Sequence, residues 1–130
     1  MILHLDTKSE TPIYVQLRNQ IVLGIGKGEL GPGDSLPTVR QLAEDIGVNP
    51  MTVSKTYAIL KTEGYLEIDR RHGATVSRKA VLNGVFQEKL KEELELLIAE
   101  SKVHGMEKES FLALCSELFS RMSFTVEEGK

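Results

Sequence analysis

The sequence has 130 residues, of which 41% are hydrophobic and 27% are charged, and its formal net charge is −3. A chain of this length can bury a core without metals or disulfides, and neither its first ten residues nor its apolar runs predict a secretion signal or a membrane span. Its single cysteine, Cys115, is expected to be a reduced core residue, so we expect a cytoplasmic protein with no membrane partner.

The charge is unevenly distributed. Residues 1–79 carry ten Lys/Arg against nine Asp/Glu, for a net +1, whereas residues 80–130 carry six against ten, for −4. Because attraction to phosphate fades within a Debye length of roughly 8–10 Å, the local balance matters more than the total. A modest basic cluster is formed by Arg70, Arg71, Arg78 and Lys79.

The first expected elements are a short strand from Ile2 to Leu5 and a helix that starts at Thr11-Pro12. The apolar face of this helix extends to about Gly26 and consists of Tyr14, Leu17, Ile21 and Ile25. The glycine-rich stretch that follows, GELGPGDSLP, predicts a loop.

Two short helices joined by a tight turn are predicted in the stretch LPTVRQLAEDIGVNPMTVSKTYAILKTE. Thr38 and Gln41 have the spacing of a capping box, and Gly47 suits the end of the first helix. Asn49 and Pro50 suit the cap and first residue of the second helix. This is helix-turn-helix geometry. The positions expected to face the core are Val39, Leu42, Ala43 and Ile46 in the first helix, and Val53, Tyr57 and Leu60 in the second.

The outward side of the second helix, a recognition helix at about residues 50–63, is polar. Small hydroxyl and amide side chains can donate and accept hydrogen bonds in the major groove, where the N-terminal residues of such a helix reach base edges. The candidate DNA-binding residues on this side are Asn49, Met51, Thr52, Ser54 and Lys55. The alternative is an ordinary solvated helix surface.

After Gly64 the apolar residues alternate, which predicts a β-hairpin over about residues 66–77. A hairpin that follows a helix-turn-helix is a wing, and a basic wing tip suits DNA phosphates or a narrow minor groove. The candidate residues at the tip are Arg70, Arg71, His72 and Gly73, the last of which is free to adopt a positive φ. The alternative is a hydrophilic turn that keeps the hairpin soluble.

From Lys79 onward two amphipathic helices are predicted, with a break at Gly105. Two apolar stripes of this size cannot easily be covered by a small winged domain, so self-association is the expected use. The candidate dimerisation residues are Val85, Phe86, Leu90, Leu94, Leu97, Ile98, Phe111, Leu114, Leu118 and Phe119.

No catalytic or cofactor site is predicted. His4, His72 and His104 are far apart in the sequence and do not have the spacing of metal ligands. The glycine-rich loop lacks the Gly-Lys-Ser/Thr ending of a phosphate loop, and Cys115 has no neighbouring cysteine or base. We expect no enzyme activity, no metal and no cofactor, and the sequence identifies no small-molecule effector.

The segments PIYVQLRNQIVLGI, GELGPGDSLPTVRQLAEDIGVNPMTVSKTYAILKTEGYL and HGATV resemble the winged helix-turn-helix domain of the GntR family of bacterial transcription regulators. The resemblance covers about residues 3–77. The two-helix tail is similar, in length and periodicity, to the YtrA-type subfamily, whose members lack a large ligand domain and dimerise through the tail.

The resemblance implies roles for individual residues. Arg40 matches a position that contacts the DNA backbone, the recognition-helix residues Thr52, Ser54 and Lys55 match positions that face the groove, and Gly73 matches the wing glycine. Two features depart from the family pattern. Pro50 departs from relatives that carry an arginine there, although Asn-Pro is usual in the YtrA type, so the base contacts of that arginine are missing. The wing reads Arg-His-Gly-Ala-Thr-Val where the usual form is Arg/Gly-x-Gly-Thr-Phe-Val.

These observations predict an α+β, mostly helical fold: a winged helix-turn-helix domain over residues 1–78 and a C-terminal two-helix dimerisation tail over residues 79–130. The expected function is a dimeric repressor that binds an inverted-repeat operator in double-stranded DNA. A winged helix used for protein interaction is the alternative. Apolar or acidic residues would be expected on the recognition face in that case, whereas here the face carries Asn49, Thr52, Ser54 and Lys55 beside Arg40.

Overall fold

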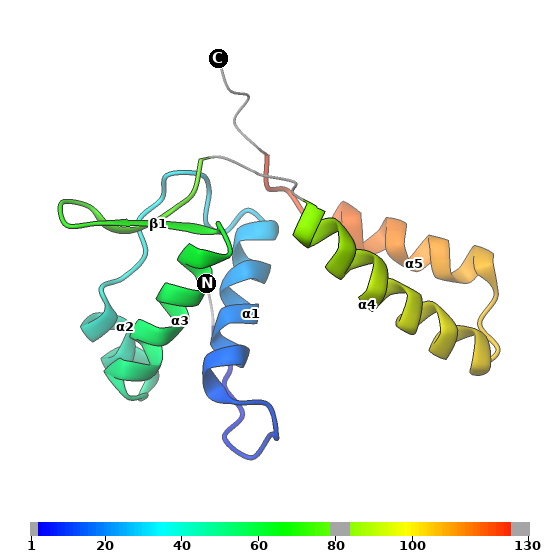
Figure 1. Cartoon of the computed structure of the whole chain (residues 1–130), viewed down its shortest axis with the longest axis horizontal. Helices are drawn as coiled ribbons and strands as arrows, with labels where there is room; N and C mark the ends of the chain where they lie inside the picture. The colour runs from blue at the N-terminus through cyan, green and yellow to red at the C-terminus, as the bar shows by residue number, and fades with distance from the viewer. Residues whose placement is uncertain (1–2, 79–83, 126–130) are drawn as a thin grey trace. The chain divides into compact units, whose positions relative to one another are not determined.

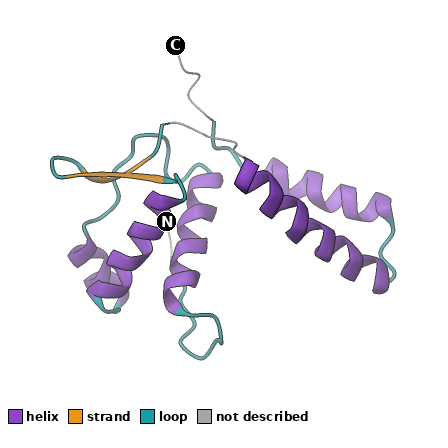
Figure 2. Ribbon diagram, viewed as in Figure 1, coloured by secondary structure: helices purple, strands orange, loops and turns teal. Residues whose placement is uncertain are grey.

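The computed structural model describes residues 3–78 and 84–125. In chain order, the elements in these residues are α1 (Ile13–Gly26), α2 (Val39–Ile46), α3 (Pro50–Thr62), β1 (Leu66–Asp69), β2 (Gly73–Val76), α4 (Gly84–Val103) and α5 (Lys108–Ser120). Helices dominate, and β1 and β2 form one antiparallel pair (Figure 2). The predicted α+β, mostly helical fold with a winged helix-turn-helix is confirmed.

The chain divides into two compact units. The first, the winged-helix unit, contains α1 to β2, and the second, the helical hairpin, spans Val81–Met122. The predicted boundary at residue 79 lies outside the described residues. At the other end, Ser123 and Phe124, which were expected in the tail, belong to the winged-helix unit.

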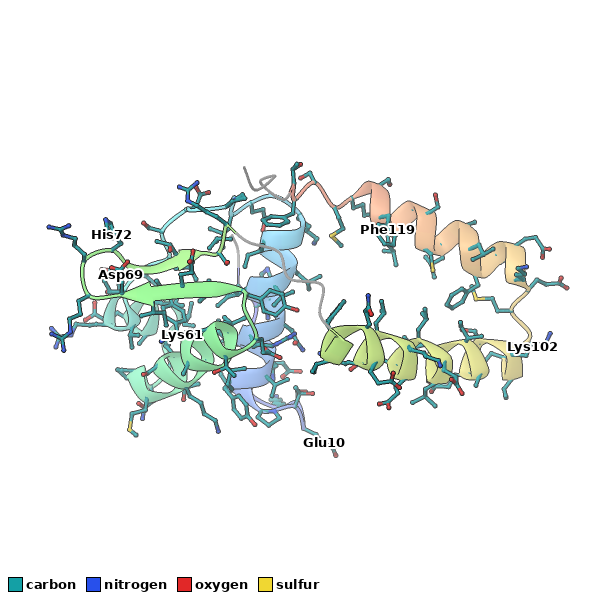
Figure 3. The ribbon with its side chains drawn as sticks, turned by 45° about the horizontal axis from the view of Figure 1, so that its top comes forward. Glu10, Lys61, Asp69, His72, Lys102 and Phe119 are labelled. Carbon is teal, nitrogen blue, oxygen red and sulfur yellow. The ribbon has the colours of Figure 1, made fainter. Side chains whose placement is uncertain are left out.

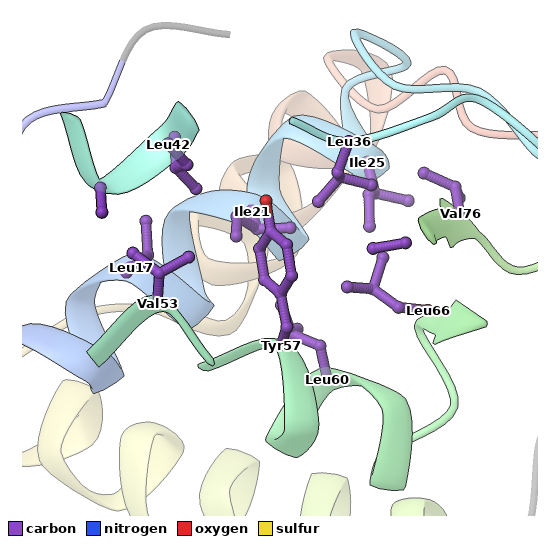
Figure 4. Packing of buried hydrophobic residues seen from close by; sticks show 12 residues of the cluster. Leu17, Ile21, Ile25, Leu36, Leu42, Val53, Tyr57, Leu60, Leu66 and Val76 are labelled. Atoms are coloured by element: carbon purple, nitrogen blue, oxygen red, sulfur yellow. The ribbon is translucent and has the colours of Figure 1, made fainter. Parts of the chain in front are cut away.

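The core of the winged-helix unit lies where α3 packs against α1, α2 and β1 (Figure 4). Leu17 and Ile21 of α1, and Val53 and Leu60 of α3, are all 0% exposed. These are positions that the helical periodicity assigned to the interior, and the wing adds Leu66 and Val76 to the same cluster. The inward side of α3 is thereby fixed, which leaves its opposite side toward solvent.

The helix ends follow the predicted signals with two differences. Thr38 Oγ1 accepts the amide of Gln41 at 3.1 Å, but the Gln41 side chain donates to Asp45 and does not complete the capping box. Gly47 ends α2 with φ 70°, as predicted. Pro12, not Thr11, is the N-cap of α1, and no side chain caps that helix.

The expected strand at Ile2–Leu5 is absent from the described residues of that range, which are 3–5. These residues run along α1, where glutamine side chains take the place of a neighbouring strand. Gln20 accepts the amide of His4 at 2.7 Å, and Gln16 accepts the amide of Asp6 at 2.8 Å. A second strand is therefore not needed to satisfy this backbone.

The end of the glycine-rich loop does pair with the wing, which the sequence did not predict. The amides of Gly33 and Leu36 donate to Val76 and Ala74, and the amide of Val76 donates to Asp34, each at 2.8 Å. β2 is therefore hydrogen-bonded on both edges, to β1 and to the loop. The wing and the segment that leads into α2 form one hydrogen-bonded structure.

In the helical hairpin, α4 and α5 are joined through a turn at Gly105, with φ 85°. Neither helix has a buried residue. Cys115, expected in a core, is only half-buried. Of the candidate dimerisation residues, Phe111 is half-buried and all of the others are exposed. None of the helices within the described residues is long and apolar enough to cross a membrane.

Candidate nucleic-acid interface

The first turn of α3 presents its backbone and small side chains to solvent. Asn49 is the N-cap, and its side-chain oxygen accepts the amide of Met51 at 2.8 Å. This bond uses one of the two lone pairs of that oxygen, so the Asn49 side chain can still offer an outside partner two N–H donors and one acceptor site. Met51 is 78% exposed, Ser54 is exposed, and Thr52 is half-buried. The predicted face therefore exists, with Thr52 at its edge.

The buried side of α3 includes one polar residue, Thr56, which was not among the positions expected to face the core. Thr56 is 0% exposed, and its hydroxyl donates to the carbonyl of Thr52 at 2.9 Å. A buried hydroxyl without a partner would be costly, so this bond lets a polar residue lie in the core. The spacing was itself a signal, because Thr56 lies three residues after Val53 and four before Leu60, on the side of the helix that the periodicity assigns to the interior.

Lys55 extends toward α1. Its Nζ lies 3.9 Å from the ring centroid of Tyr14, which is close enough for a cation–π interaction. Tyr14, which the helical periodicity placed on the apolar face of α1, thus also positions a charged side chain of the recognition helix. The positive charge of exposed Lys55 is therefore held on the side of α3 that lies next to α1.

Two further contacts fix α3 relative to its neighbours. At its C-terminal end, Arg18 of α1 forms an ion pair with Glu63 at 2.8 Å, which raises the pKa of Arg18, and its guanidinium also lies over the ring of Tyr65. In its middle, the hydroxyl of Tyr57 donates to the carbonyl of Pro37 at 2.8 Å. Burial raises the pKa of Tyr57 to about 12, so this hydroxyl stays protonated at neutral pH.

Arg40 is exposed in the first turn of α2, two residues after the Thr38 cap. It forms no ion pair with any residue of the described ranges, so its guanidinium remains available to an outside anion. This agrees with the phosphate-contacting position that the resemblance implies.

The wing tip is organised by a residue that was not among the candidates. The carboxylate of Asp69 accepts the amides of Arg71 at 2.8 Å and His72 at 2.5 Å, and one of its oxygens lies 3.2 Å from Nδ1 of His72. Figure 3 shows Asp69 and His72 together at the turn. The backbone amide of His72 is the main reason why the pKa of Asp69 is lowered. An aspartate that starts a turn by accepting the amide two residues further on is a known turn signal, so the sequence did contain this signal.

The tip presents Arg70 and Arg71 to solvent beside Gly73, which has φ 66° as predicted. The wider basic cluster is not intact, because the guanidinium of Arg78 lies against Gly33, away from the tip turn. Lys79 lies outside the described residues. The candidate interface thus consists of two exposed parts, the outward side of α3 with Arg40, and the wing tip.

Comparison with known proteins identifies the family to which this chain belongs. The family described as "Bacterial regulatory proteins, gntR family" matches residues 11–76. The chain is 37% identical, over 99% of its length and 98% of the other, to the HTH-type transcriptional repressor YtrA of Bacillus subtilis (strain 168). The chain belongs to the GntR family. It is a DNA-binding transcriptional regulator and not an enzyme.

Two solved structures are also similar to this GntR protein. A transcriptional antiterminator from Listeria monocytogenes EGD-e is 26% identical, covers 99% of this chain and 98% of its own, and has a TM-score of 0.83. The DNA-binding domain of AraR, solved in complex with its operator ORE1, is 26% identical, with a TM-score of 0.51 over 59% of this chain and 94% of that one. Within the residues described in this GntR protein, no group of three or more potential ligands could hold a metal ion.

Proposed function

We propose that this GntR protein is a homodimeric repressor that binds an inverted-repeat operator in the cytoplasm. Residues 1–78 contact DNA through the recognition helix and the wing, and residues 79–130 provide the dimer. The observation that carries the proposal is the pairing of an exposed polar face on α3 with a helical hairpin that has no buried residue. The name of the Bacillus subtilis relative, a transcriptional repressor, supports the same direction of regulation.

The division of labour follows from the chemistry of each part. Met51, Thr52 and Ser54 lie at the start of α3, where apolar contact with thymine methyl groups and hydroxyl bonds to base edges are possible. Arg40 and the wing arginines are charged, exposed and suited to phosphates, which position a protein without reading sequence. Lys55 is charged like the phosphate-contacting arginines, but it lies on the recognition helix beside the Tyr14 ring, and we assign it to reading the sequence.

The dimer follows from the apolar surface of the hairpin. Most of the stability of helices in proteins comes from packing an amphipathic face, so α4 and α5, which have no buried residue, would gain stability if that face were covered. A second copy offers the same surface, and most soluble oligomers are symmetric homodimers. Two-fold symmetry then requires two half-sites in opposite orientation, with centres roughly 10 bp apart or a multiple of that distance.

The test has three readouts on the full chain. Sedimentation at micromolar concentration should give twice the monomer mass of 14.5 kDa. Selection from a random duplex pool, followed by footprinting, should give a site with dyad symmetry. With about six phosphate contacts per dimer, log K should fall against log salt with a slope of about −5. A monomer, a site without dyad symmetry or salt-independent binding would contradict the proposal.

A substitution series separates positioning from reading. Arg40→Ala should weaken binding to the selected site and to a scrambled duplex by about the same factor. Thr52→Ala or Lys55→Ala should instead change which sites are preferred. Titration against both duplexes at fixed salt measures the ratio. If Arg40→Ala changed that ratio as much as Lys55→Ala does, the assigned roles would be wrong.

A further inference from the structure

The segment after α5 returns to the winged-helix unit. The amides of Ser123 and Phe124 both donate to the carbonyl of Gly26, the last residue of α1, at 3.0 Å each. The hydroxyl of Ser123 donates to the carbonyl of Lys27 at 2.6 Å. Helix C-termini leave carbonyls without intrahelical partners, and this segment satisfies one of them. We call Ser123 and Phe124 the return segment.

The return segment is also held by apolar contact. Phe124 is half-buried and packs against the core of the winged-helix unit. Gly28, with φ 83°, lies directly under Ser123, and a methyl group at this glycine would overlap the Ser123 hydroxyl. Main-chain bonds, a side-chain bond and an apolar anchor therefore act together on two consecutive residues.

The position of the return segment in the chain allows it to restrict the motion of the helical hairpin. The helical hairpin leaves the winged-helix unit after Arg78 through residues 79–83, and α5 ends at Ser120. Only Arg121 and Met122 separate the end of α5 from the return segment. The hairpin is thus joined to the winged-helix unit at both of its ends. A single linker allows rotation about every backbone dihedral between two bodies, whereas a second short connection removes much of that freedom.

We infer that Ser123 and Phe124 are specificity-determining residues that act on half-site spacing without touching DNA. The inference rests on the proposed dimer and its inverted-repeat operator. The hairpins join two winged-helix units, and the return segments narrow the range of separations and rotations that these units can adopt. An operator with the matching spacing is then bound by both winged-helix units of the dimer, whereas an operator with another spacing is bound by only one of them.

The size of the effect follows from effective concentration. When two linked modules can engage together, the linked affinity exceeds that of one module by about 10²–10⁴-fold, and the gain is lost where the geometry forbids it. Moving half-sites apart by three base pairs rotates them by roughly a third of a turn. The native dimer should lose about 100-fold in affinity on such a duplex. A dimer with open return segments should lose less than about tenfold.

Two pairs of variants test this in the full chain. Phe124→Ala removes the apolar anchor, and Thr125→Ser is its control, because it keeps the hydroxyl that donates to the carbonyl of Ser123 at 3.4 Å. Gly28→Ala displaces Ser123 from the other side. Its control is Gly64→Ala, because Gly64 also has a positive φ, 90°, and has nothing within 4 Å of the added methyl group. The backbone strain is thus matched, and only one variant of the pair disturbs the return segment.

The probes are the inverted repeat that the native protein selects, the same repeat with one to five central base pairs inserted, and a single half-site. Phe124→Ala and Gly28→Ala should keep dimer mass and half-site affinity, and should flatten the dependence on spacing. Thr125→Ser and Gly64→Ala should keep the native dependence on spacing. The inference would be overturned if Phe124→Ala and Gly28→Ala lost as much affinity on the lengthened repeats as the native protein does. It would also be overturned if the two controls became as insensitive to spacing as these variants. Failure of the proposed function would appear earlier, as a native protein that is monomeric or selects no repeat.

Discussion

The two units of this GntR protein use apolar residues in opposite ways. In the winged-helix unit, Leu17, Ile21, Val53 and Leu60 are completely buried by their own chain. In the helical hairpin, the exposed fraction of the large apolar residues of α4 ranges from 37% at Leu94 to values above 80%. Both units have amphipathic helices, so periodicity alone does not tell whether a face is covered from within. The first unit is therefore stabilised by its own chain, whereas the exposed apolar surface of the second is where we propose that a second copy binds.

The largest expected effect is on the stability of the winged-helix unit. Leu60→Ala should lower its free energy of unfolding by roughly 2–5 kcal/mol, because a cavity replaces a fully buried side chain. Leu96→Ala in α4, at an exposed leucine, is the matched control and should cost less than about 1 kcal/mol. All three tyrosines, at positions 14, 57 and 65, lie in the winged-helix unit, and the chain has no tryptophan. Tyrosine fluorescence during urea unfolding therefore reports on this unit alone.

The next effect is on assembly. Leu94→Asp places a charge on the more covered side of α4 and should convert the dimer to monomer, with operator affinity falling about 100-fold. Val103→Asp is the control, because nine helical positions place it on the opposite side of α4. Sedimentation and operator titration measure both variants. Should Leu94→Asp remain dimeric, the apolar side of the hairpin would have another use.

A smaller effect is expected at alkaline pH in the winged-helix unit. The folded pKa of Tyr57 is about 12, above the ordinary value of 10, so its contribution to stability is complete below pH 10 and is lost as pH rises toward 12. At pH 11 the loss should be about 1.4 kcal/mol. Tyr57→Phe should be less stable than the native protein by about 1 kcal/mol at pH 8, through the lost bond to Pro37, and about equally stable at pH 11. Urea titrations at both pH values measure the difference.

The smallest expected effect concerns the ion pair between Arg18 of α1 and Glu63 at the end of α3. A double-mutant cycle of Arg18→Ala and Glu63→Ala should give a coupling energy of about 0.5–1 kcal/mol, because the pair is only partly exposed but still reached by solvent. The exposed pair Arg121–Glu117 in the hairpin is the comparison and should give less. Equal coupling energies would mean that the partial burial of Arg18 adds nothing.

Local signals in the sequence predicted most of the winged-helix unit. Gly47 and Asn49 end and start helices as expected, and Gly73 has the positive φ that the hairpin requires. Each of these depends on a residue's own backbone or on neighbours within four positions, so the pattern carries the information. The recognition face followed from the same periodicity, since burial of Val53 and Leu60 leaves Met51 and Ser54 outside.

Contacts between residues distant in the sequence could not be predicted in this way. The ring of Tyr14 under Lys55 joins residues in two helices, and the return of Ser123 to Lys27 joins residues 96 positions apart. Neither contact has a periodic or motif signature. At the wing tip the turn signal at Asp69 was present in the sequence, but positive charge, which marks Arg70 and Arg71 as candidates, does not identify the residue that shapes the turn.

The pairing of the loop with β2 has a consequence for how this sequence can change in length. Gly33 and Leu36 are hydrogen-bonded to the wing in a fixed register, and Leu36 is two residues from the cap of α2. After an insertion between them, Gly33 and Leu36 could not both keep their partners in β2, and the residues on one side of the insertion would exchange faces. An insertion in residues 29–32, after Lys27 and Gly28 that the return segment contacts, leaves those bonds in place. Evolutionary gains and losses of residues in this loop are therefore expected before Gly33, and recombination between relatives should tolerate a junction there.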